Sequence, residues 1–156
     1  ILKSPPPVEA FNRSGPLPAL HQAKCEGELY DLLEKRAHQL LSQGFETIAI
    51  ICKTEKETEE AYENLKDRLD LHFIKKDSHS YQKGINLIPV YLAKGIEFDA
   101  VLIYNCSKDA YRKEEERTLF YAACTRAMHV LDLFYVGDVS PFIEGVPSAL
   151  YERAQS

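Results

Sequence analysis

One segment of the chain is a continuous apolar strand that leads at once into a helix. Thr47–Cys52 reads Thr-Ile-Ala-Ile-Ile-Cys, a β-branched run typical of parallel strands that are covered on both faces. Thr54 and Glu57 follow at the spacing of a capping box, in which the two side chains satisfy amides of the first helical turn. This spacing predicts a helix that continues to about Leu69. A buried strand followed by a helix favours an α/β fold.

The remaining apolar segments continue this alternation. Glu26–Gln43 carries leucines at helical spacing and is followed by Gly44, which predicts an amphipathic helix with a glycine stop. Further strands are predicted at 71–75, 86–90, 100–105 and 129–136, and a further helix at 114–127. Strands that alternate with helices predict a mainly parallel sheet with helices on both faces.

The opening residues predict a connector rather than a helix. Three consecutive prolines at positions 5–7 remove backbone donors and force extended geometry on their neighbours, and Val8–Arg13 alternates weakly, as in a short edge strand. The chain starts at Ile1 rather than methionine, so we expect it to be a piece of a longer polypeptide. Because 156 residues allow a single core, we divide the chain into a connector and edge segment (1–25), one α/β domain (26–145) and a C-terminal tail (146–156).

Charge and cysteine spacing narrow the class of function. A net charge of −5 without a block of lysines or arginines argues against strong free-standing binding to phosphate backbones, so any nucleic-acid contact must be local. The four cysteines lack Cys-x-x-Cys spacing, which predicts buried free thiols and no metal site. The apolar runs are too short to cross a bilayer, so we expect a cytoplasmic protein with no membrane partner.

Two segments carry the residues of chemical interest. Residues 92–99 read Leu-Ala-Lys-Gly-Ile-Glu-Phe-Asp, and residues 117–127 end in Thr-Arg-Ala. Together they resemble motifs V and VI of the UvrD/Rep-like superfamily 1 helicases. In that family both motifs lie on the second of two RecA-like domains and complete an ATP site whose phosphate-binding loop lies on the first. The resemblance implies that 26–145 is a RecA-like second motor domain.

The resemblance also implies a role for each matching residue. Lys94 and Gly95 correspond to the motif V turn, where a glycine lets the backbone approach phosphates or the neighbouring domain. Glu97 corresponds to the family glutamate that accepts hydrogen bonds from the nucleotide ribose. Arg126 corresponds to the arginine finger, whose guanidinium offsets the charge that phosphoryl transfer spreads over the γ-phosphate oxygens. Since ligands of open α/β sheets lie at the carboxyl ends of the strands, we expect both motifs to reach that edge.

Simpler interpretations remain open for these charged residues. Glu97 fits an ordinary glutamate at the start of a short helical turn, and Arg126 fits an ordinary cation beside the last carbonyls of a helix. Arg117 lies nine positions before Arg126. At about 100° per residue it points to nearly the opposite side of the helix, so we assign it to a structural salt bridge or a coupling role. Each motif alone is a weak signal, and their order and context favour the helicase interpretation.

Two further residues are candidates for contact with nucleic acid. Tyr91 stands where family members often carry a histidine near single-stranded DNA, and it either stacks on a base or packs under a helix. Thr125 shares a helix face with Tyr121, which suits a packed seam or a relay between ATP and nucleic acid. With Pro89 and Tyr91 before the Lys-Gly pair, the segment is closer to the HelD-like branch, whose members act on RNA polymerase. RNA polymerase is therefore a candidate partner.

The sequence contains no phosphate-binding loop of the form Gly-x-x-x-x-Gly-Lys-Ser/Thr, so the expected fold is RecA-like without its own P-loop. No apolar strand ends in an acidic pair suited to ordering a metal and water. The resemblance then implies ATP with Mg²⁺ held jointly with a P-loop domain of the same polypeptide, single-stranded nucleic acid as the track, and no turnover by the isolated chain. The competing interpretations are a non-catalytic interaction module of a transcription or repair complex and, more weakly, a stand-alone nucleotide-binding domain.

Overall fold

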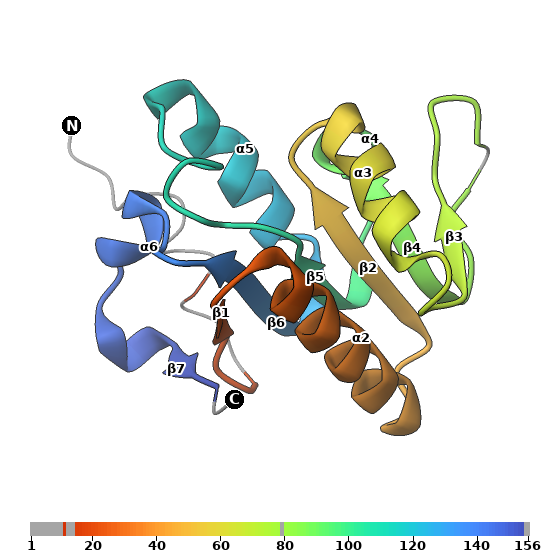
Figure 1. The fold of residues 1–156 in the computed structure, drawn as a ribbon, viewed down its shortest axis with the longest axis horizontal. Coiled ribbons are helices and arrows are strands. Elements are labelled where there is room, and N and C mark those ends of the chain that lie inside the picture. Colours follow the sequence, from red (N-terminus) through yellow and green to blue (C-terminus); the bar gives the residue numbers. More distant parts are fainter. Residues whose placement is uncertain (1–10, 12–14, 79, 155–156) are drawn as a thin grey trace.

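The computed structural model describes residues 11, 15–78 and 80–154. The described strands form one seven-stranded sheet in the order β3-β4-β2-β5-β6-β1-β7 (Figure 1). Every ladder between neighbouring strands is parallel. The predicted α/β class with a mainly parallel sheet is therefore confirmed.

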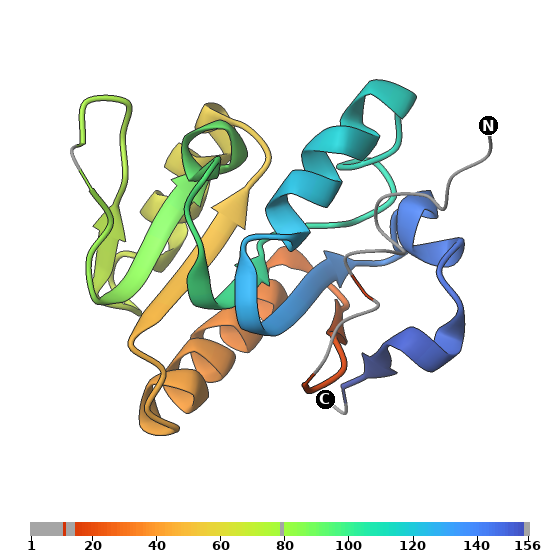
Figure 2. The ribbon, with the colours of Figure 1, turned by 180° about the vertical axis from the view of Figure 1, so that it is seen from behind.

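Helices cover both faces of this sheet, as Figures 1 and 2 show from opposite sides, with α2 and α3 on one face and α4 and α5 on the other. The strands are β1 Ala19–Ala23, β2 Thr47–Cys52, β3 Leu71–Phe73, β4 Gly84–Pro89, β5 Phe98–Ile103, β6 Ala127–Val136 and β7 Glu152–Arg153. The helices are α2 Glu26–Ser42, α3 Glu55–Leu65, α4 Val90–Ala93, α5 Glu114–Cys124 and α6 Pro141–Glu144, with a 3₁₀ turn η1 at Ser148–Leu150.

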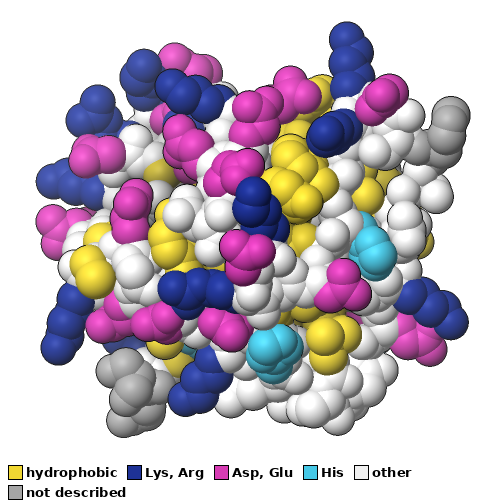
Figure 3. All heavy atoms as spheres, turned by 45° about the vertical axis from the view of Figure 1, so that its right-hand side comes forward, with side chains coloured by type: hydrophobic (Ala, Val, Ile, Leu, Met, Phe, Trp, Pro, Cys, Tyr) yellow, Lys and Arg dark blue, Asp and Glu magenta, His cyan; other side chains and the backbone are white. Residues whose placement is uncertain are grey.

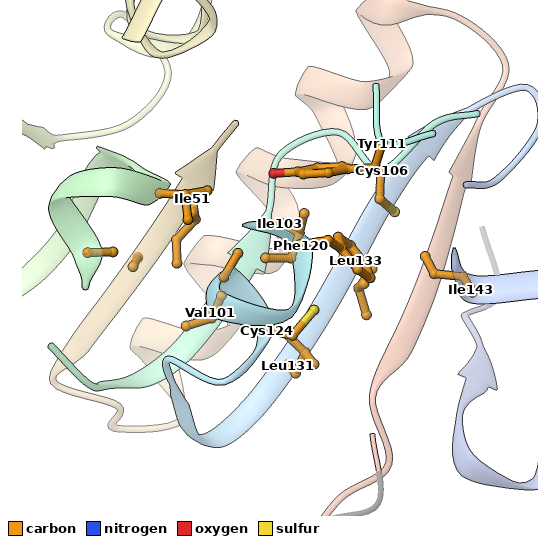
Figure 4. Packing of buried hydrophobic residues seen from close by; sticks show 14 of the residues in the cluster. Ile51, Val101, Ile103, Cys106, Tyr111, Phe120, Cys124, Leu131, Leu133 and Ile143 are labelled. Atoms are coloured by element: carbon orange, nitrogen blue, oxygen red, sulfur yellow. The ribbon is translucent and has the colours of Figure 1, made fainter. Parts of the chain in front are cut away.

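The core consists of two apolar layers, one on each face of the sheet. Ile48 and Ile50 of β2 belong to the layer under α2 and α3, whereas Ile51 belongs to the layer under α4 and α5. Figure 4 shows the second layer, in which Phe120 of α5 lies over Val101, Ile103, Leu131 and Leu133 of the central strands. Both faces of β2 are thus buried, which explains why its sequence is apolar without alternation.

The capping box before α3 forms with one change of partner. The Thr54 side chain accepts a hydrogen bond from the Glu57 amide (3.0 Å), as predicted. The Glu57 carboxylate accepts from the amide of Lys53 (2.8 Å) rather than from that of Thr54. The helix ends at Leu65 and not at Leu69, so its predicted end was wrong by one turn.

Both terminal segments contribute strands to the sheet. β1 lies inside the predicted connector (1–25) and pairs with β6, and β7 lies inside the predicted tail (146–156) and pairs with β1. The sheet therefore extends beyond 26–145. The edge strand predicted at Val8–Arg13 lies outside the described residues except for Phe11, which is buried and makes an edge-to-face ring contact with Tyr151.

A buried carboxylate ties β1 and α2 to β6. Asp132 of β6 is fully buried, and its carboxylate accepts a hydrogen bond from Arg36 Nε at 3.0 Å and lies 2.6 Å from His21 Nε2. The His21 ring also stacks on Phe134, with ring centroids 4.4 Å apart. Through Asp132, this network joins α2 and β6 to β1, a strand that the sequence did not predict.

Three of the four cysteines are buried free thiols, as predicted, but Cys25 is exposed at the start of α2. Among the described residues no helix is long and apolar enough to cross a bilayer.

Candidate functional site

The Lys-Gly-Ile-Glu segment connects the carboxyl end of β4 to the amino end of β5. α4 occupies the first turn after β4, and the chain then reverses at Gly95, whose φ of +82° is a conformation that favours glycine. A Cβ at Gly95 would meet no atom within 4 Å, so the backbone conformation and not the available space requires glycine there. Lys94, Gly95 and Glu97 are all exposed.

The Thr-Arg-Ala segment forms the turn between α5 and β6. α5 ends at Cys124, Thr125 and Arg126 make the turn, and β6 begins at Ala127. Because β6 starts directly after this turn, Arg126 lies at the amino end of β6, at an edge of the sheet.

Glu97 and Arg126 lie at the starts of two adjacent strands. The amide of Phe98 donates to the carbonyl oxygen of Arg126 (2.8 Å), and Phe98 pairs with Ala127 in the β5–β6 ladder. Both candidate residues therefore occupy one edge of the sheet, at the amino ends of its strands, which we call the amino edge. The predicted placement at the carboxyl edge was wrong for both residues, because each follows its helix and directly precedes its strand.

The Arg126 side chain folds back on the last turn of α5. Its Nε donates to the carbonyl oxygen of Ala122 (3.1 Å), and its Nη2 donates to Thr125 Oγ1 (3.3 Å). The Thr125 hydroxyl in turn donates to the same Ala122 oxygen (3.0 Å). This is the helix-end contact that the simpler interpretation of Arg126 predicts, and it leaves the guanidinium half-buried at the amino edge.

Glu97 lies in an open groove at the amino edge. The groove has a volume of about 540 Å³ and is lined by Gly44, Phe45, Glu46, Thr47, Tyr81, Glu97, Asp99, Met128 and His129. The carboxylate of Asp99 is occupied by the amides of Glu46 and Thr47, at 3.0 and 3.1 Å. Glu46, the third lining carboxylate, lies 3.4 Å from Lys83 Nζ. Exposed Glu97 has no such partner within the part of the chain that the structure describes, so its carboxylate is available to a ligand. Arg126 borders the same edge without lining this groove.

The two nucleic-acid candidates are not brought together. Tyr91 lies in α4 at the carboxyl end of β4, is 48% exposed, and neighbours Glu55, the first residue of α3. Partial desolvation and a hydrogen bond with the Glu55 carboxylate raise the pKa of Tyr91. Thr125 lies at the amino edge beside Arg126. The sheet therefore separates the two candidates.

Arg117 has the structural role that its helical position predicts. Its Nε donates to Glu114 Oε1 one turn earlier (3.0 Å), and its guanidinium lies over the Phe142 ring at 4.7 Å. The salt bridge predicted for Arg117 is confirmed.

A polar network that the sequence reasoning missed lies at the carboxyl edge. Lys53, which follows β2, donates through Nζ to Glu116 Oε2 and to the carbonyl oxygen of Ala110, both at 2.5 Å. Glu116 also accepts from the backbone amides of Arg112 and Lys113. The signal was present in the sequence, since a glutamate in the third position of a helix commonly caps its own amino end.

Glu116 makes the stability of the fold depend on pH in the acidic range. Desolvation alone would raise the pKa of Glu116, but the hydrogen bonds from Lys53, Arg112 and Lys113 outweigh it and lower the pKa to about 2. A depressed folded-state pKa means that ionised Glu116 stabilises the fold above about pH 4.5, and that this stability is lost as pH falls toward 2.

We expect Glu116→Gln to lower the free energy of unfolding by about 1–2 kcal/mol at neutral pH, since both side chains of the pair with Lys53 are partly exposed. Urea unfolding at pH 7 and at pH 3 measures this effect, which should shrink at the lower pH. Glu115→Gln, at an exposed neighbouring position, is the control. A loss of stability that is as large at pH 3 as at pH 7 would contradict the assignment.

The surface carries charges of both signs. On the face shown in Figure 3, Lys and Arg side chains alternate with Asp and Glu side chains, and no area of one sign forms. This agrees with the net charge of −5 and leaves nucleic-acid contact to local features.

Several known proteins are similar to this chain in sequence or in fold. The profile of the UvrD-like helicase C-terminal domain matches residues 17–137. The C-terminal domain of a possible DNA helicase from Lactobacillus plantarum WCFS1 is 34% identical with a TM-score of 0.85, over 95% of this chain and 92% of that chain. The probable DNA helicase II homolog of Mycoplasma pneumoniae is 41% identical over an alignment of 68 residues that covers 36% of this chain and 10% of that protein. The C-terminal domain of the DEAD-box protein Dbp5 shares the fold, at 14% identity and a TM-score of 0.57, over 85% of this chain and 82% of that chain.

The fold is that of the RecA-like C-terminal domains found in helicases. The chain belongs to the UvrD-like helicase C-terminal domain family. It spans about a tenth of the length of the curated relative that it matches. These relatives do not confirm the HelD-like branch, lend no support to RNA polymerase as a partner, and do not favour the non-catalytic interaction module.

The family implies ATP and Mg²⁺. The candidate residues of this chain suit the nucleotide but do not form a metal site. Glu97 offers an exposed acceptor and Arg126 a cation on one edge, which suit a ribose and a phosphate. Within the described residues, no group of three or more His, Cys, Asp or Glu is placed to hold a metal ion.

Proposed function

We propose that this chain is the second motor domain of an ATP-dependent superfamily 1 helicase or translocase. In this proposal it completes an ATP site whose P-loop lies on another domain of the same polypeptide. The observation that carries the proposal is the shared edge of Glu97 and Arg126, joined by the 2.8 Å hydrogen bond between Phe98 and Arg126. The two residues directly precede neighbouring strands. The carboxylate would meet the ribose of the nucleotide, and the guanidinium would meet its γ-phosphate.

Each residue has a task that suits its chemistry. Glu97 accepts hydrogen bonds from the ribose hydroxyls, since an ionised carboxylate is an acceptor only. Its groove, at about 540 Å³, is within the size range of small-molecule sites. Arg126 places its fixed positive charge against the γ-phosphate, where charge develops during phosphoryl transfer. Gly95 holds the turn that brings Glu97 to the edge, with Lys94 exposed beside it. Mg²⁺, when bound with the nucleotide, would offset part of the phosphate charge.

The amino edge also carries apolar side chains that suit a covering domain. Four large exposed hydrophobic residues, at 38–49% exposure, lie beside the strand starts: Leu17, Leu41, Tyr81 and Met128. Tyr81 and Met128 line the same groove as Glu97. A second domain that closes on ATP would bury these side chains together with the nucleotide. Such closure and reopening would move the two domains along single-stranded nucleic acid.

Tyr91 is the residue that we propose for contact with that strand. Its exposed ring lies at the carboxyl edge, away from the ATP edge. Base stacking on an aromatic ring tolerates any sequence and is worth about 1–3 kcal/mol per base. Contact at the opposite edge would let nucleotide and nucleic acid bind at the same time.

The ribose contact is tested by Glu97→Gln in the intact polypeptide. We expect the KM for ATP to rise about tenfold with kcat little changed, because the lost charge-assisted hydrogen bond is made equally in ground and transition states. The wild type should also prefer ATP to 2′,3′-dideoxy-ATP, and the variant should lose most of that preference. Glu60→Gln, at an exposed position on α3, is the control. An unchanged preference in the Glu97 variant would sink the assignment.

A further inference from the structure

Three hydrogen bonds form a closed set at the end of α5. The carbonyl oxygen of Ala122 accepts from Arg126 Nε (3.1 Å) and from the Thr125 hydroxyl (3.0 Å). Thr125 Oγ1 then accepts from Arg126 Nη2 (3.3 Å). The hydroxyl is donor and acceptor at once, so it links the guanidinium to the helix end by a second route.

This set leaves one side of the guanidinium available. An arginine side chain has five N–H donors in a rigid planar fork. Nε and one N–H of Nη2 are engaged with Ala122 and Thr125, and within the described residues Nη1 has no protein partner. Held at two points, the plane of the guanidinium cannot turn freely, and the N–H donors of Nη1 are left for another acceptor.

We propose that Thr125 is the positioning residue for Arg126: its hydroxyl fixes the plane of the guanidinium so that Nη1 meets the γ-phosphate. This inference rests on the proposed function, because it needs Arg126 to act on the nucleotide. It assigns Thr125 to the ATP edge rather than to nucleic acid. A preorganised cation stabilises the transition state without reorienting during the reaction, so the hydroxyl acts on kcat more than on KM.

A merely structural threonine would behave differently. Its hydroxyl would satisfy the Ala122 carbonyl at the helix end, and its removal would cost stability without a selective effect on the chemical step. Thr125→Val removes the hydroxyl and keeps the branched shape, whereas Thr125→Ser keeps the hydroxyl and removes a methyl group. The pair separates the two roles.

The experiment measures steady-state ATP turnover and thermal unfolding of the intact polypeptide that contains the P-loop domain. For Thr125→Val we expect kcat to fall about tenfold, the effect of about one hydrogen bond, with KM within about twofold. Thr125→Ser should keep kcat within about threefold of the wild type. In an Arg126→Ala background, Thr125→Val should have no further effect on kcat, since both residues act as one unit.

Each other outcome overturns the inference. If Thr125→Val keeps wild-type kcat, or if Thr125→Ser is as slow as Thr125→Val, the hydroxyl does not position Arg126. The same holds if Thr125→Val still lowers kcat in the Arg126→Ala background. If Arg126→Ala itself turns over normally, the proposed function fails and this inference with it. A slow Arg126→Ala combined with a normal Thr125→Val rejects the positioning role alone.

Discussion

Replacing Arg126 with alanine is expected to lower ATP turnover of the intact polypeptide by about a thousandfold or more. The guanidinium offsets charge that develops on the γ-phosphate oxygens only during the reaction, so its loss acts on kcat. Nucleotide binding should stay within about tenfold, because Glu97 and the P-loop domain still hold the ribose and the phosphates. Steady-state kinetics and equilibrium nucleotide titration measure the two quantities separately.

Helix α5, which precedes Arg126, provides a matched control. Arg117 of α5 is paired with Glu114 and lies over Phe142, so Arg117→Ala removes an equal charge from α5 without touching the amino edge. We expect kcat of that variant to stay within a few fold of the wild type. Equal losses of turnover in the two variants would mean that Arg117 and Arg126 both act through the stability of the α5 region.

The second large effect concerns the buried carboxylate of β6. Asp132→Ala is expected to destabilise the chain by about 3–5 kcal/mol, since it leaves Arg36 and His21 without their shared acceptor. The loss should loosen β1 and α2 from β6, because these two elements hold the network. Denaturant unfolding of the chain measures the difference in free energy.

Asp109→Ala, at an exposed position in the loop after β5, is the matched control and should change the stability by less than about 0.5 kcal/mol. Hydrogen exchange gives a local test, because the amides of β1 should lose more protection than those of β2. A destabilisation of Asp132→Ala below about 1 kcal/mol would show that the network is not needed to hold β1 in the sheet.

The alternation of strands and helices could be predicted from periodicity because the core strands are buried on both faces. β2 and α3 are strong signals, with an unbroken apolar run and a threonine cap. β1 escaped prediction because Ala-Leu-His-Gln-Ala has little β propensity, and its place in the sheet depends on pairing with β6 and on the buried contact between His21 and Asp132. Such long-range contacts leave no local pattern.

The sequence selects candidate site residues, but it does not predict the edge of the sheet on which they lie. A family resemblance selected Glu97 and Arg126, yet their expected edge was wrong, because each residue directly precedes its strand rather than following one. The four-residue helix α4 let the chain return to the start of β5 within a few residues. The separation of Tyr91 from Thr125 follows from that same path, and the sequence alone did not show it.

The most direct test of the account is a structure of the intact polypeptide with a non-hydrolysable ATP analogue. We expect Arg126 Nη1 within about 3 Å of a γ-phosphate oxygen while Nε stays on the Ala122 carbonyl, and the Glu97 carboxylate at hydrogen-bond distance from a ribose hydroxyl. A nucleotide bound with its γ-phosphate against another cation, and with both side chains in solvent, would contradict it.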